Sequence, residues 1–260
     1  MNLSPLSWDT DHIQLNQAIR AGSYGIPDAA KASRYPIRLM RYWYMFHLLL
    51  EEQQRLGRPL RVCEIGVDSG QMLAYLRSSL KVMKRDQVIY DRWYAVDVRV
   101  QEAALRAAGY TEFITANVEN DQFTIPDGFD VVIALHVLEH LSQPELAMRR
   151  IAMSLRSGAL VIGGHPVTPE FFRRRREKRL RARAKPTPGH FPHVSVFSPT
   201  RVVQMAERSG CKVDFMSGAF CFRSGGFFAE NYPAWFRFNA WFGAMFPSWP
   251  GELYWAIRHA

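Results

Sequence analysis

Residues 129–141 read FDVVIALHVLEHL, and this stretch decides the fold. Its first part, Phe129 to Leu135, is an almost uninterrupted apolar run. Such a run is typical of a central parallel strand that is covered on both faces. Two histidines and a glutamate follow it directly, so polar chemistry begins where the expected strand ends.

Strand-like and helix-like segments alternate on both sides of this run. The expected strands are 61–65, 93–98, 112–116, 159–163, 212–216 and 252–257, and the expected helices are 37–56, 69–80, 101–108, 142–155 and 198–210. Ser142 and Glu145 form an S-x-x-E capping box at the start of one of these helices. The alternation predicts an α/β fold, a Rossmann-like doubly wound and mostly parallel sheet with helices on both faces.

Polar or glycine residues follow the expected strands at their carboxyl ends, where ligands bind in such sheets. Gly66 and Gly70 flank the first strand-to-helix turn, and glycines there let the backbone approach a ligand closely. Asp97 ends the second strand, where a carboxylate can accept hydrogen bonds from ribose hydroxyls. Asn117 follows the third strand and His136 follows the fourth. The sequence therefore predicts a nucleotide-like ligand at this edge.

The segments RVCEIGVDSG, WYAVDV, TANVEN, GFDVVIALHVLEHL and LRSGALVIGGHP together resemble the class I S-adenosylmethionine (SAM)-dependent methyltransferases in order and in strand position. The resemblance covers roughly residues 60–166 and 189–257. Residues 189–210 resemble the substrate-side segment of the branch that methylates small molecules and glycans. The resemblance implies SAM as cofactor, with S-adenosylhomocysteine as product. It also implies a single methyltransferase domain over 1–260, which divides into an N-terminal helical cap (1–58), a SAM-binding core (59–166), a basic insert (167–188) and a substrate-side half with an aromatic tail (189–260).

The resemblance assigns roles to individual residues. Those matching the family's cofactor site are Glu64, Gly66 and Gly70 around the methionine part of SAM, Asp97 at the ribose, Val98, Asn117 and Val118 at the adenine, and Leu135 and His136 at the methyl-transfer site. Two positions depart from the family pattern. Asp68 replaces the middle glycine of the turn, where it could meet the SAM ammonium group, and Asn117 replaces an acidic adenine reader.

Histidines are the candidates for the chemistry. Methyl transfer from a sulfonium needs an aligned nucleophile and often the removal of a hydroxyl proton, a task that histidine suits near neutral pH. His136 is the first candidate for a base or a substrate positioner, and His165 and His193 are further candidates. A purely structural place in a loop is the alternative for His165, and a structural place in a helix-start turn is the prediction for His140.

Some related methyltransferases bind a divalent ion through Glu-x-x-Glu-His and a later histidine. This chain has His136-x-x-Glu139-His140, with His165, His190 or His193 as the later histidine. Because the first carboxylate is missing, the sequence predicts no metal.

The net charge is +9, from 33 Lys and Arg against 24 Asp and Glu, and it is concentrated in one segment. Residues 171–185 hold nine cations and one anion, so they carry +8 and the rest of the chain carries +1. Thr168-Pro169-Glu170 is a good helix start. The segment is therefore interpreted as a projecting cationic helix that seeks an anion, with a solvated basic face or a disordered loop as the alternatives.

The tail 231–255 is rich in aromatic residues. Trp235, Phe238, Phe242 and Met245 share one helical face, which predicts a contact with the core or with a second copy in a homodimer. Beside a basic helix, such a face also fits a membrane surface. Peripheral membrane contact through 171–185 and 231–249 is therefore a further expectation.

Composition excludes several classes. With 48% hydrophobic and 22% charged residues, the whole chain is not disordered, collagen-like or a coiled coil. Neither a secretory signal nor an 18-residue apolar span is visible, and three cysteines do not suggest a disulfide framework. These features predict a cytoplasmic protein, with an inner membrane face as the place of peripheral contact.

Three hypotheses on function remain. The favoured one is a SAM-dependent enzyme (EC 2.1.1.-) that O-methylates a small molecule, a sugar or a lipid-linked glycan, with an anionic acceptor in view of the basic insert. The second is an RNA methyltransferase that uses the arginine-rich segment, which is less favoured because the rest of the chain is near neutral. The third is a non-catalytic membrane-surface protein that retains the fold.

Overall fold

The computed structural model describes residues 4–10, 39–120, 122–126, 128–185, 191–222, 229 and 232–260. Most of the expected N-terminal cap and the candidate metal ligand His190 lie outside the described residues.

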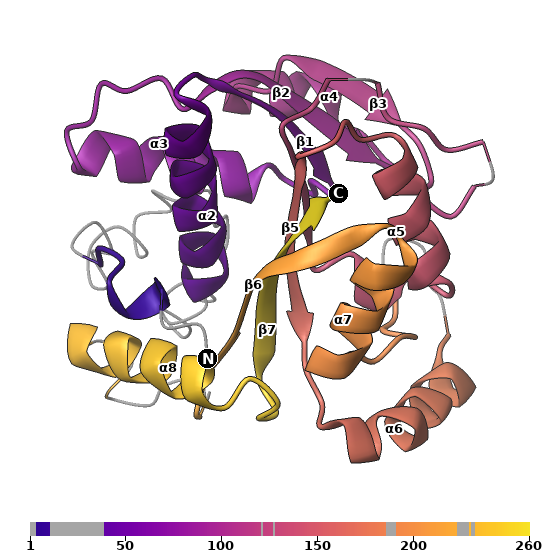
Figure 1. Ribbon diagram of the computed structural model, residues 1–260. Helices are drawn as coiled ribbons and strands as arrows, with labels where there is room; N and C mark the ends of the chain where they lie inside the picture. The colour runs from indigo at the N-terminus through magenta and orange to yellow at the C-terminus, as the bar shows by residue number, and fades with distance from the viewer. Residues whose placement is uncertain are drawn as a thin grey trace.

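A seven-stranded sheet forms the centre of the molecule, in the order β3-β2-β1-β4-β5-β7-β6 (Figure 1). The strands are β1 (Leu60–Ile65), β2 (Tyr90–Asp97), β3 (Glu112–Thr115), β4 (Val131–Leu135), β5 (Leu160–Pro166), β6 (Cys211–Ala219) and β7 (Glu252–His259). The first five strands pair in parallel, and β7 runs antiparallel between β5 and β6. The predicted doubly wound and mostly parallel α/β sheet is therefore confirmed.

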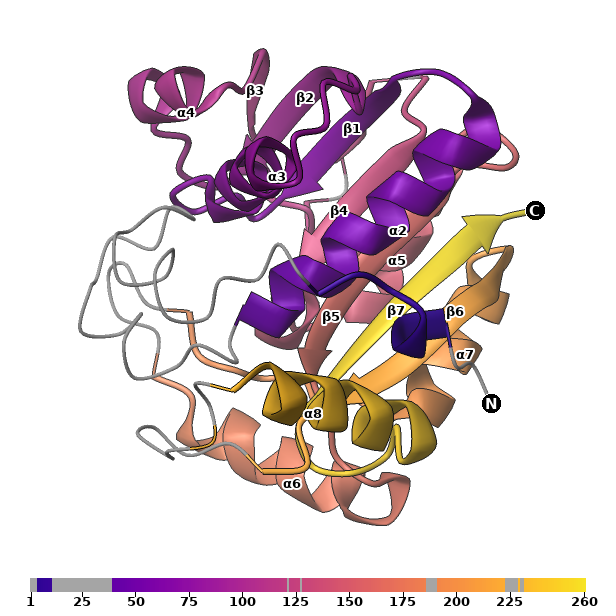
Figure 2. The same cartoon turned by 90° about the vertical axis from the view of Figure 1, so that its left-hand side faces the viewer.

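Helices cover both faces of the sheet. They are α2 (Met40–Leu56), α3 (Gln71–Val82), α4 (Glu102–Ala108), α5 (Pro144–Met153), α6 (Glu170–Arg183), α7 (Pro199–Arg208) and α8 (Pro233–Met245), with short 3-10 helices η1 (Ser4–Leu6) and η3 (Leu138–His140). One core joins α2, α3 and α8 to one face, and a second core joins α5 and α7 to the other. In Figure 2, α2 crosses the near face of the sheet and α8 lies below it.

The expected capping box at α5 does not form. The N-cap of α5 is Gln143, and no side chain caps the helix. Ser142 instead donates its hydroxyl to Glu119, and Glu145 accepts a hydrogen bond from Arg201. Ser142 and Glu145 thus bind residues distant in the sequence, and not each other's helix end as the S-x-x-E pattern predicts.

Helix α6 forms as the sequence predicts and has no buried residue. It begins one residue later than the expected cap implies, because Pro169 is the N-cap and Thr168 accepts a hydrogen bond from Arg176 instead. One face is anchored to the body, since Glu177 pairs with Arg201 at 2.6 Å. Figures 1 and 2 both place α6 and α8 at the lower end of the molecule.

Helix α8 buries a different face from the expected one. Its buried residues are Phe236, Asn239, Ala240, Gly243 and Ala244. The expected stripe lies beside this face, with Phe238 39% exposed. Small residues make the contact because the backbone of Gly243 packs directly on the backbone of Gly218 in β6, where a methyl group on Gly243 would approach within 2.0 Å. Of the expected stripe, Trp235 still packs against the core while Phe238 is exposed, so the expectation of a core contact holds only in part. Contact with a second copy stays a prediction.

Two further expectations concern cysteines and membrane spans. All three cysteines are free thiols. Within the described residues, no helix is both long enough and apolar enough to cross a membrane.

Candidate functional site

A cavity of about 600 Å³ opens at the carboxyl ends of β1 to β4. Its lining comes from the ends of these strands, from the segments that follow them and, at one position, from the segment before α7. It comprises Ile65, Gly66, Asp68, Val96, Asp97, Val98, Arg99, Gln101, Ala116, Asn117, Val118, Glu119, His136, Val137, His140, Leu141 and Phe191. Seven of the predicted site residues are among these: Gly66, Asp68, Asp97, Val98, Asn117, Val118 and His136. Residues that are spread over 70 positions of sequence thus meet at the carboxyl ends of neighbouring strands, as the sequence predicts.

The turn after β1 has a left-handed backbone at three positions. Gly66 has a φ of 75° and Gly70 a φ of 76°, which glycine tolerates readily. Asp68 lies between them with a φ of 46°, an uncommon conformation for a residue with a side chain. A methyl group on Gly66 would come within 2.4 Å of Val137. The turns after β1 and β4 are therefore in contact through this glycine.

Asp97 is held in place by backbone donors. Its Oδ1 accepts a hydrogen bond from the amide of Arg99 at 3.0 Å, and its Oδ2 accepts one from the amide of Asp68 at 3.4 Å. Two carboxylate oxygens retain further lone pairs for a ligand. Asn117 uses its side-chain oxygen locally, where it accepts the amide of Glu119 at 2.9 Å.

Three predicted cofactor residues do not line the cavity. Glu64 is a buried residue of β1, and its carboxylate accepts hydrogen bonds from Trp93 at 2.9 Å and from Tyr110 at 2.7 Å. Burial raises its pKa to about 7, although the two donors act in the opposite direction. Gly70 begins α3 and faces Tyr110, and Leu135 is half-buried at the end of β4.

His136 has carboxylates on both sides. Its Nδ1 is 2.8 Å from Glu139, and its Nε2 is 3.5 Å from Glu252 at the start of β7. Arg41 of α2 donates to the other oxygen of Glu252 at 2.7 Å. Burial and Arg41 lower the pKa of His136, but Glu252 and Glu139 raise it more, so the net shift is upward. The φ of His136 is 56°, which is strained backbone at a cavity wall.

Sequence reasoning missed Glu252 and Arg41. Their only sequence signal is weak: each is a charged residue within an otherwise apolar segment. Both are buried, and buried charges are rare unless they are paired.

His165 lies away from the cavity. It is fully buried, and its ring stacks on Phe197 with the centroids 4.0 Å apart. Trp255 donates its indole N–H to Nε2 of His165 at 3.0 Å. Burial lowers the pKa of His165 to about 4, so the ring is neutral at physiological pH. Its surroundings are those of a packed side chain.

His193 lies at the cavity rim. Its ring packs edge-on against His140 with the centroids 4.7 Å apart, and His140 lines the cavity. Nearby, Arg99 lies over the ring of Phe191 at 5.3 Å. Neither of these two residues was predicted from sequence, because their contact joins segments more than 90 positions apart.

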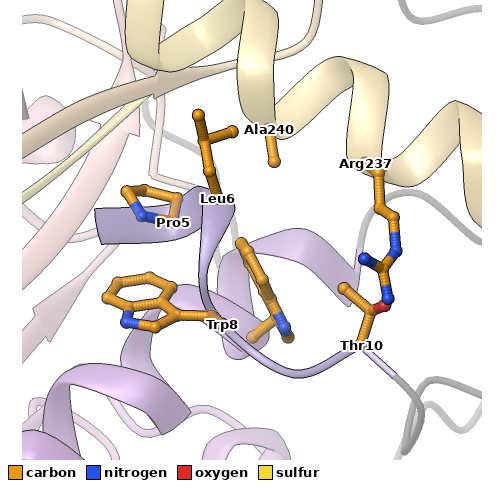
Figure 3. Close-up of a pocket in the computed structure, with 7 residues that line it drawn as sticks. Pro5, Leu6, Trp8, Thr10, Arg237 and Ala240 are labelled. Carbon is orange, nitrogen blue, oxygen red and sulfur yellow. The ribbon is translucent and has the colours of Figure 1, made fainter. Parts of the chain in front are cut away.

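A second pocket of about 50 Å³ lies between η1 and α8. Figure 3 shows Leu6 and Ala240 on one side of it, with the side chain of Arg237 extending toward Thr10. It is far smaller than the 300–1,000 Å³ typical of small-molecule sites. We therefore place the candidate site in the larger cavity.

Comparison with known proteins places the chain in a family. A family model described as a methyltransferase domain matches residues 38–214, more than half of the chain. The chain therefore belongs to this methyltransferase family, and its fold is that of the class I SAM-dependent methyltransferases. Among curated proteins, none matches the sequence.

Solved structures share the fold at low identity. A chain from a complex between the Haloferax volcanii Trm112 methyltransferase activator and a protein described as a methyltransferase aligns with a TM-score of 0.54 and 16% identity, over 88% of this chain and 95% of that one. The [4+2]-cyclase SpnF aligns with a TM-score of 0.53 and 16% identity, over 94% and 92%. The N-methyltransferase NodS from Bradyrhizobium japonicum, solved with S-adenosylhomocysteine, aligns with a TM-score of 0.51 and 14% identity, over 95% and 98%. A cyclase and an N-methyltransferase thus share this fold, so the fold alone does not decide the chemistry.

Proposed function

We propose that the protein binds SAM in the cavity at β1 to β4 and transfers its methyl group to a hydroxyl of a small molecule, a sugar or a lipid-linked glycan. One observation carries the proposal: a single cavity gathers Gly66, Asp97, Asn117 and His136 from the ends of four different strands. Its volume of about 600 Å³ falls within the usual range for small-molecule sites.

The cavity offers a partner for each part of SAM. Asp97 would accept the ribose hydroxyls, since its carboxylate is already oriented by two backbone amides. Val98 is 40% exposed and would pack against the adenine, with Asn117 and Val118 at the adenine edge. At the other end, the close backbone of Gly66 would admit the methionine part, and Asp68 would face its ammonium group.

His136 would position the acceptor rather than remove its proton. Both of its ring nitrogens face carboxylates, so neither points freely into the cavity. The next residue, Val137, contacts Gly66 and so joins the turn after β4 to the turn after β1. An aligned acceptor is the main requirement of an in-line displacement.

Transfer of a labelled methyl group from SAM tests the reaction. A screen of sugar, nucleotide-sugar and lipid-linked acceptors should yield a labelled product, and His136→Ala should lower kcat by at least about 10-fold while changing the Kd of SAM by less than about 3-fold. SAM binding without transfer to any acceptor would favour a different reaction, as in the cyclase neighbour, or a non-catalytic protein. Equal kcat values for His136→Ala and the wild type would remove His136 from the site.

The acceptor would be presented at an anionic lipid surface. On α6, the face opposite Glu177 carries Arg175, Lys178, Arg179 and Arg183, which recur at helical spacing and are all exposed. Phe171 and Phe172 lie in the first turn of the same helix and are 88% and 55% exposed. Cations with exposed aromatic side chains complement an anionic membrane surface.

Helix α8 extends this surface. Trp241 is 43% exposed, and Phe246 and Trp249 just after the helix are 50% and 49% exposed. Because α6 and α8 lie at the same end of the molecule, they could contact one surface together (Figures 1 and 2). The protein would then be peripheral at the inner face of a membrane.

Co-sedimentation with vesicles tests this contact. A variant with Arg175, Lys178, Arg179 and Arg183 changed to Gln should lose at least about 10-fold in affinity for vesicles that contain anionic phosphatidylglycerol, since each cation near such a surface contributes about 1 kcal/mol. A control with the exposed residues Lys81, Lys84, Arg85 and Arg208 changed to Gln has the same net charge and should retain binding.

Two results would contradict the membrane proposal. One is equal loss of vesicle binding in both variants, which would make the attraction a matter of net charge alone. The other is steep, salt-dependent binding of RNA in place of vesicles, lost only in the α6 variant, which would favour the RNA methyltransferase.

A further inference from the structure

A second polar cluster lies at the rim of the cavity. Glu139 and His140 come from η3, and His193 comes from the segment that precedes α7. Each offers one ligand atom, a carboxylate oxygen or an imidazole nitrogen, and these atoms all lie within 4.8 Å of one another.

Glu139 provides the first independent sign of a ligand. The residue is only 1% exposed, and one carboxylate oxygen, Oε1, is 2.8 Å from Nδ1 of His136. Among the residues that the structure describes, none donates a hydrogen bond to the other oxygen, Oε2. A buried carboxylate oxygen without a partner is costly, and a bound cation would remove that cost.

His140 is oriented as a metal ligand. Its Nδ1 is 3.3 Å from the carbonyl oxygen of Pro192, which can only accept a hydrogen bond. Nδ1 must therefore carry the proton, and Nε2 keeps its lone pair. Histidines that bind metals usually donate their other ring N–H in this way to a carbonyl or a carboxylate.

The backbone holds the two segments together. The carbonyl oxygen of Glu139 accepts the amides of Val194 and Ser195 at 2.8 and 3.0 Å. The hydroxyl of Ser195 donates to the carbonyl of Leu141 at 2.7 Å. His193 is thus fixed beside η3 by contacts that do not involve its own side chain.

We propose that Glu139, His140 and His193 bind a divalent transition metal ion of the zinc type. Two imidazoles and a carboxylate are the usual protein ligands of such ions, and three ligands leave a fourth position open. Ligand atoms around zinc are roughly 3.4 Å apart, so the cluster must contract slightly, and the exposed His193 is the side chain able to move.

This proposal revises the prediction from sequence. There, the absence of a carboxylate at position 136 argued against a metal. In the structure, His136 is not needed as a ligand, because it contacts Oε1 of Glu139, orients that carboxylate and leaves Oε2 without a partner among the described residues. Contacts of this kind from outside the ligand set strengthen metal sites.

The open position would take an oxygen atom of the acceptor. This role rests on the proposed function, whereas metal binding itself does not. His140 lines the cavity, so a hydroxyl bound to the metal would lie next to the proposed SAM site. A metal-bound hydroxyl loses its proton more readily, and the proton would leave to the solvent that reaches His193.

Titration of the chelator-treated full chain tests the proposal. Co²⁺ is followed by visible absorption and Zn²⁺ by calorimetry, with SAM titrated separately on the same protein. We expect one equivalent of each metal in the wild type. His193→Ala should weaken binding by at least about 100-fold, beyond the 10- to 100-fold loss typical of an outer contact. The control is His259→Ala, which removes a partly exposed histidine near the end of β7 and should bind as the wild type does.

Glu139→Gln provides a second test, because it keeps the shape of the side chain and removes its charge. It should also lose metal, with an unchanged circular dichroism spectrum. The proposal is overturned if the wild type binds neither metal, or if His193→Ala binds as tightly as the wild type. Metal binding without SAM binding would refute the proposed function alone, and SAM binding without metal would refute this inference alone.

Discussion

The two halves of the sheet use polar residues at their strand ends in opposite ways. At β1 to β4, such residues line the cavity, and the hydrogen-bond donors to Asp97 among the described residues are backbone amides. At β5 and β7, His165 and Glu252 are buried and bind other side chains, Trp255 and Arg41. The antiparallel strand β7 causes the difference, because it pairs with β5 as far as Pro166 and occupies the space beside it. A polar strand end thus indicates a ligand only where that space is left open.

The largest effect is expected when a polar group is removed from the closed half of the sheet, at β5 and β7. His165→Ala should lower the free energy of unfolding by about 5 kcal/mol, because it leaves a cavity beside Phe197 and deprives the indole N–H of Trp255 of its acceptor. Chemical denaturation measures this loss. Methyl transfer per folded molecule should fall by less than about 3-fold, and a loss of kcat as large as that of His136→Ala would place His165 in the chemistry after all.

Gly66→Ala comes next, in the open half. The new methyl group would clash with Val137 and would occupy a left-handed backbone, so we expect a loss of about 4 kcal/mol in the free energy of unfolding. Gly158→Ala is the matched control. Gly158 has a similar φ of 79° but nothing within 4 Å, so its loss should be only about 1 kcal/mol. Equal losses would show that the turns after β1 and β4 do not touch.

Glu64→Gln tests a polar residue that lies on a strand of the β1–β4 half but is buried. A carboxyl whose pKa rises to about 7 on folding stabilises the protein fully only below its ordinary pKa of 4.5, and this stability is lost as the pH rises to 7. The loss corresponds to about 3 kcal/mol. Glutamine stays neutral and keeps an oxygen for Trp93 and Tyr110.

Thermal unfolding at two pH values measures this effect. Glu64→Gln should be more stable than the wild type at pH 8, by up to about 3 kcal/mol, and about equally stable at pH 5. The Kd of SAM should change by less than about 3-fold, because Glu64 lies outside the cavity lining. A large loss of SAM affinity would instead support the contact with the methionine part that the family resemblance implies.

The smallest changes in unfolding free energy are expected on α6, where a variant on the anchored face is compared with one on the outward face. Arg181→Gln should cost about 1 kcal/mol of unfolding free energy, since Arg181 pairs with Glu177 at 3.0 Å and donates to the carbonyl of Val194. Arg175→Gln, on the outward face, should change it by less than about 0.5 kcal/mol. Denaturation curves that reverse this order would mean that the outward face is the anchored one.

The sequence predicts the fold well because periodicity reports burial directly. The run at 131–135 and the glycine turn at 66–70 each needed only local information, and both are present. The cavity lining follows in part from the rule that strand ends meet at one edge. Contacts between distant segments do not follow from it: Glu252 beside His136, Arg201 on Glu145 and His193 beside His140 become visible only in three dimensions. Local patterns also compete with such contacts, as the unformed capping box at Ser142 shows.

SAM binding by the wild type and by Asp97→Ala tests the central claim most directly. Isothermal titration should show one SAM per chain for the wild type and a loss of about 3 kcal/mol, roughly 100-fold in Kd, for Asp97→Ala, because two ribose hydroxyls lose a charged acceptor. Asp91→Ala removes an exposed carboxylate near the other end of β2 and should bind SAM as the wild type does. Absence of SAM binding in the wild type, or equal affinity in Asp97→Ala, would contradict the assignment of this cavity to SAM.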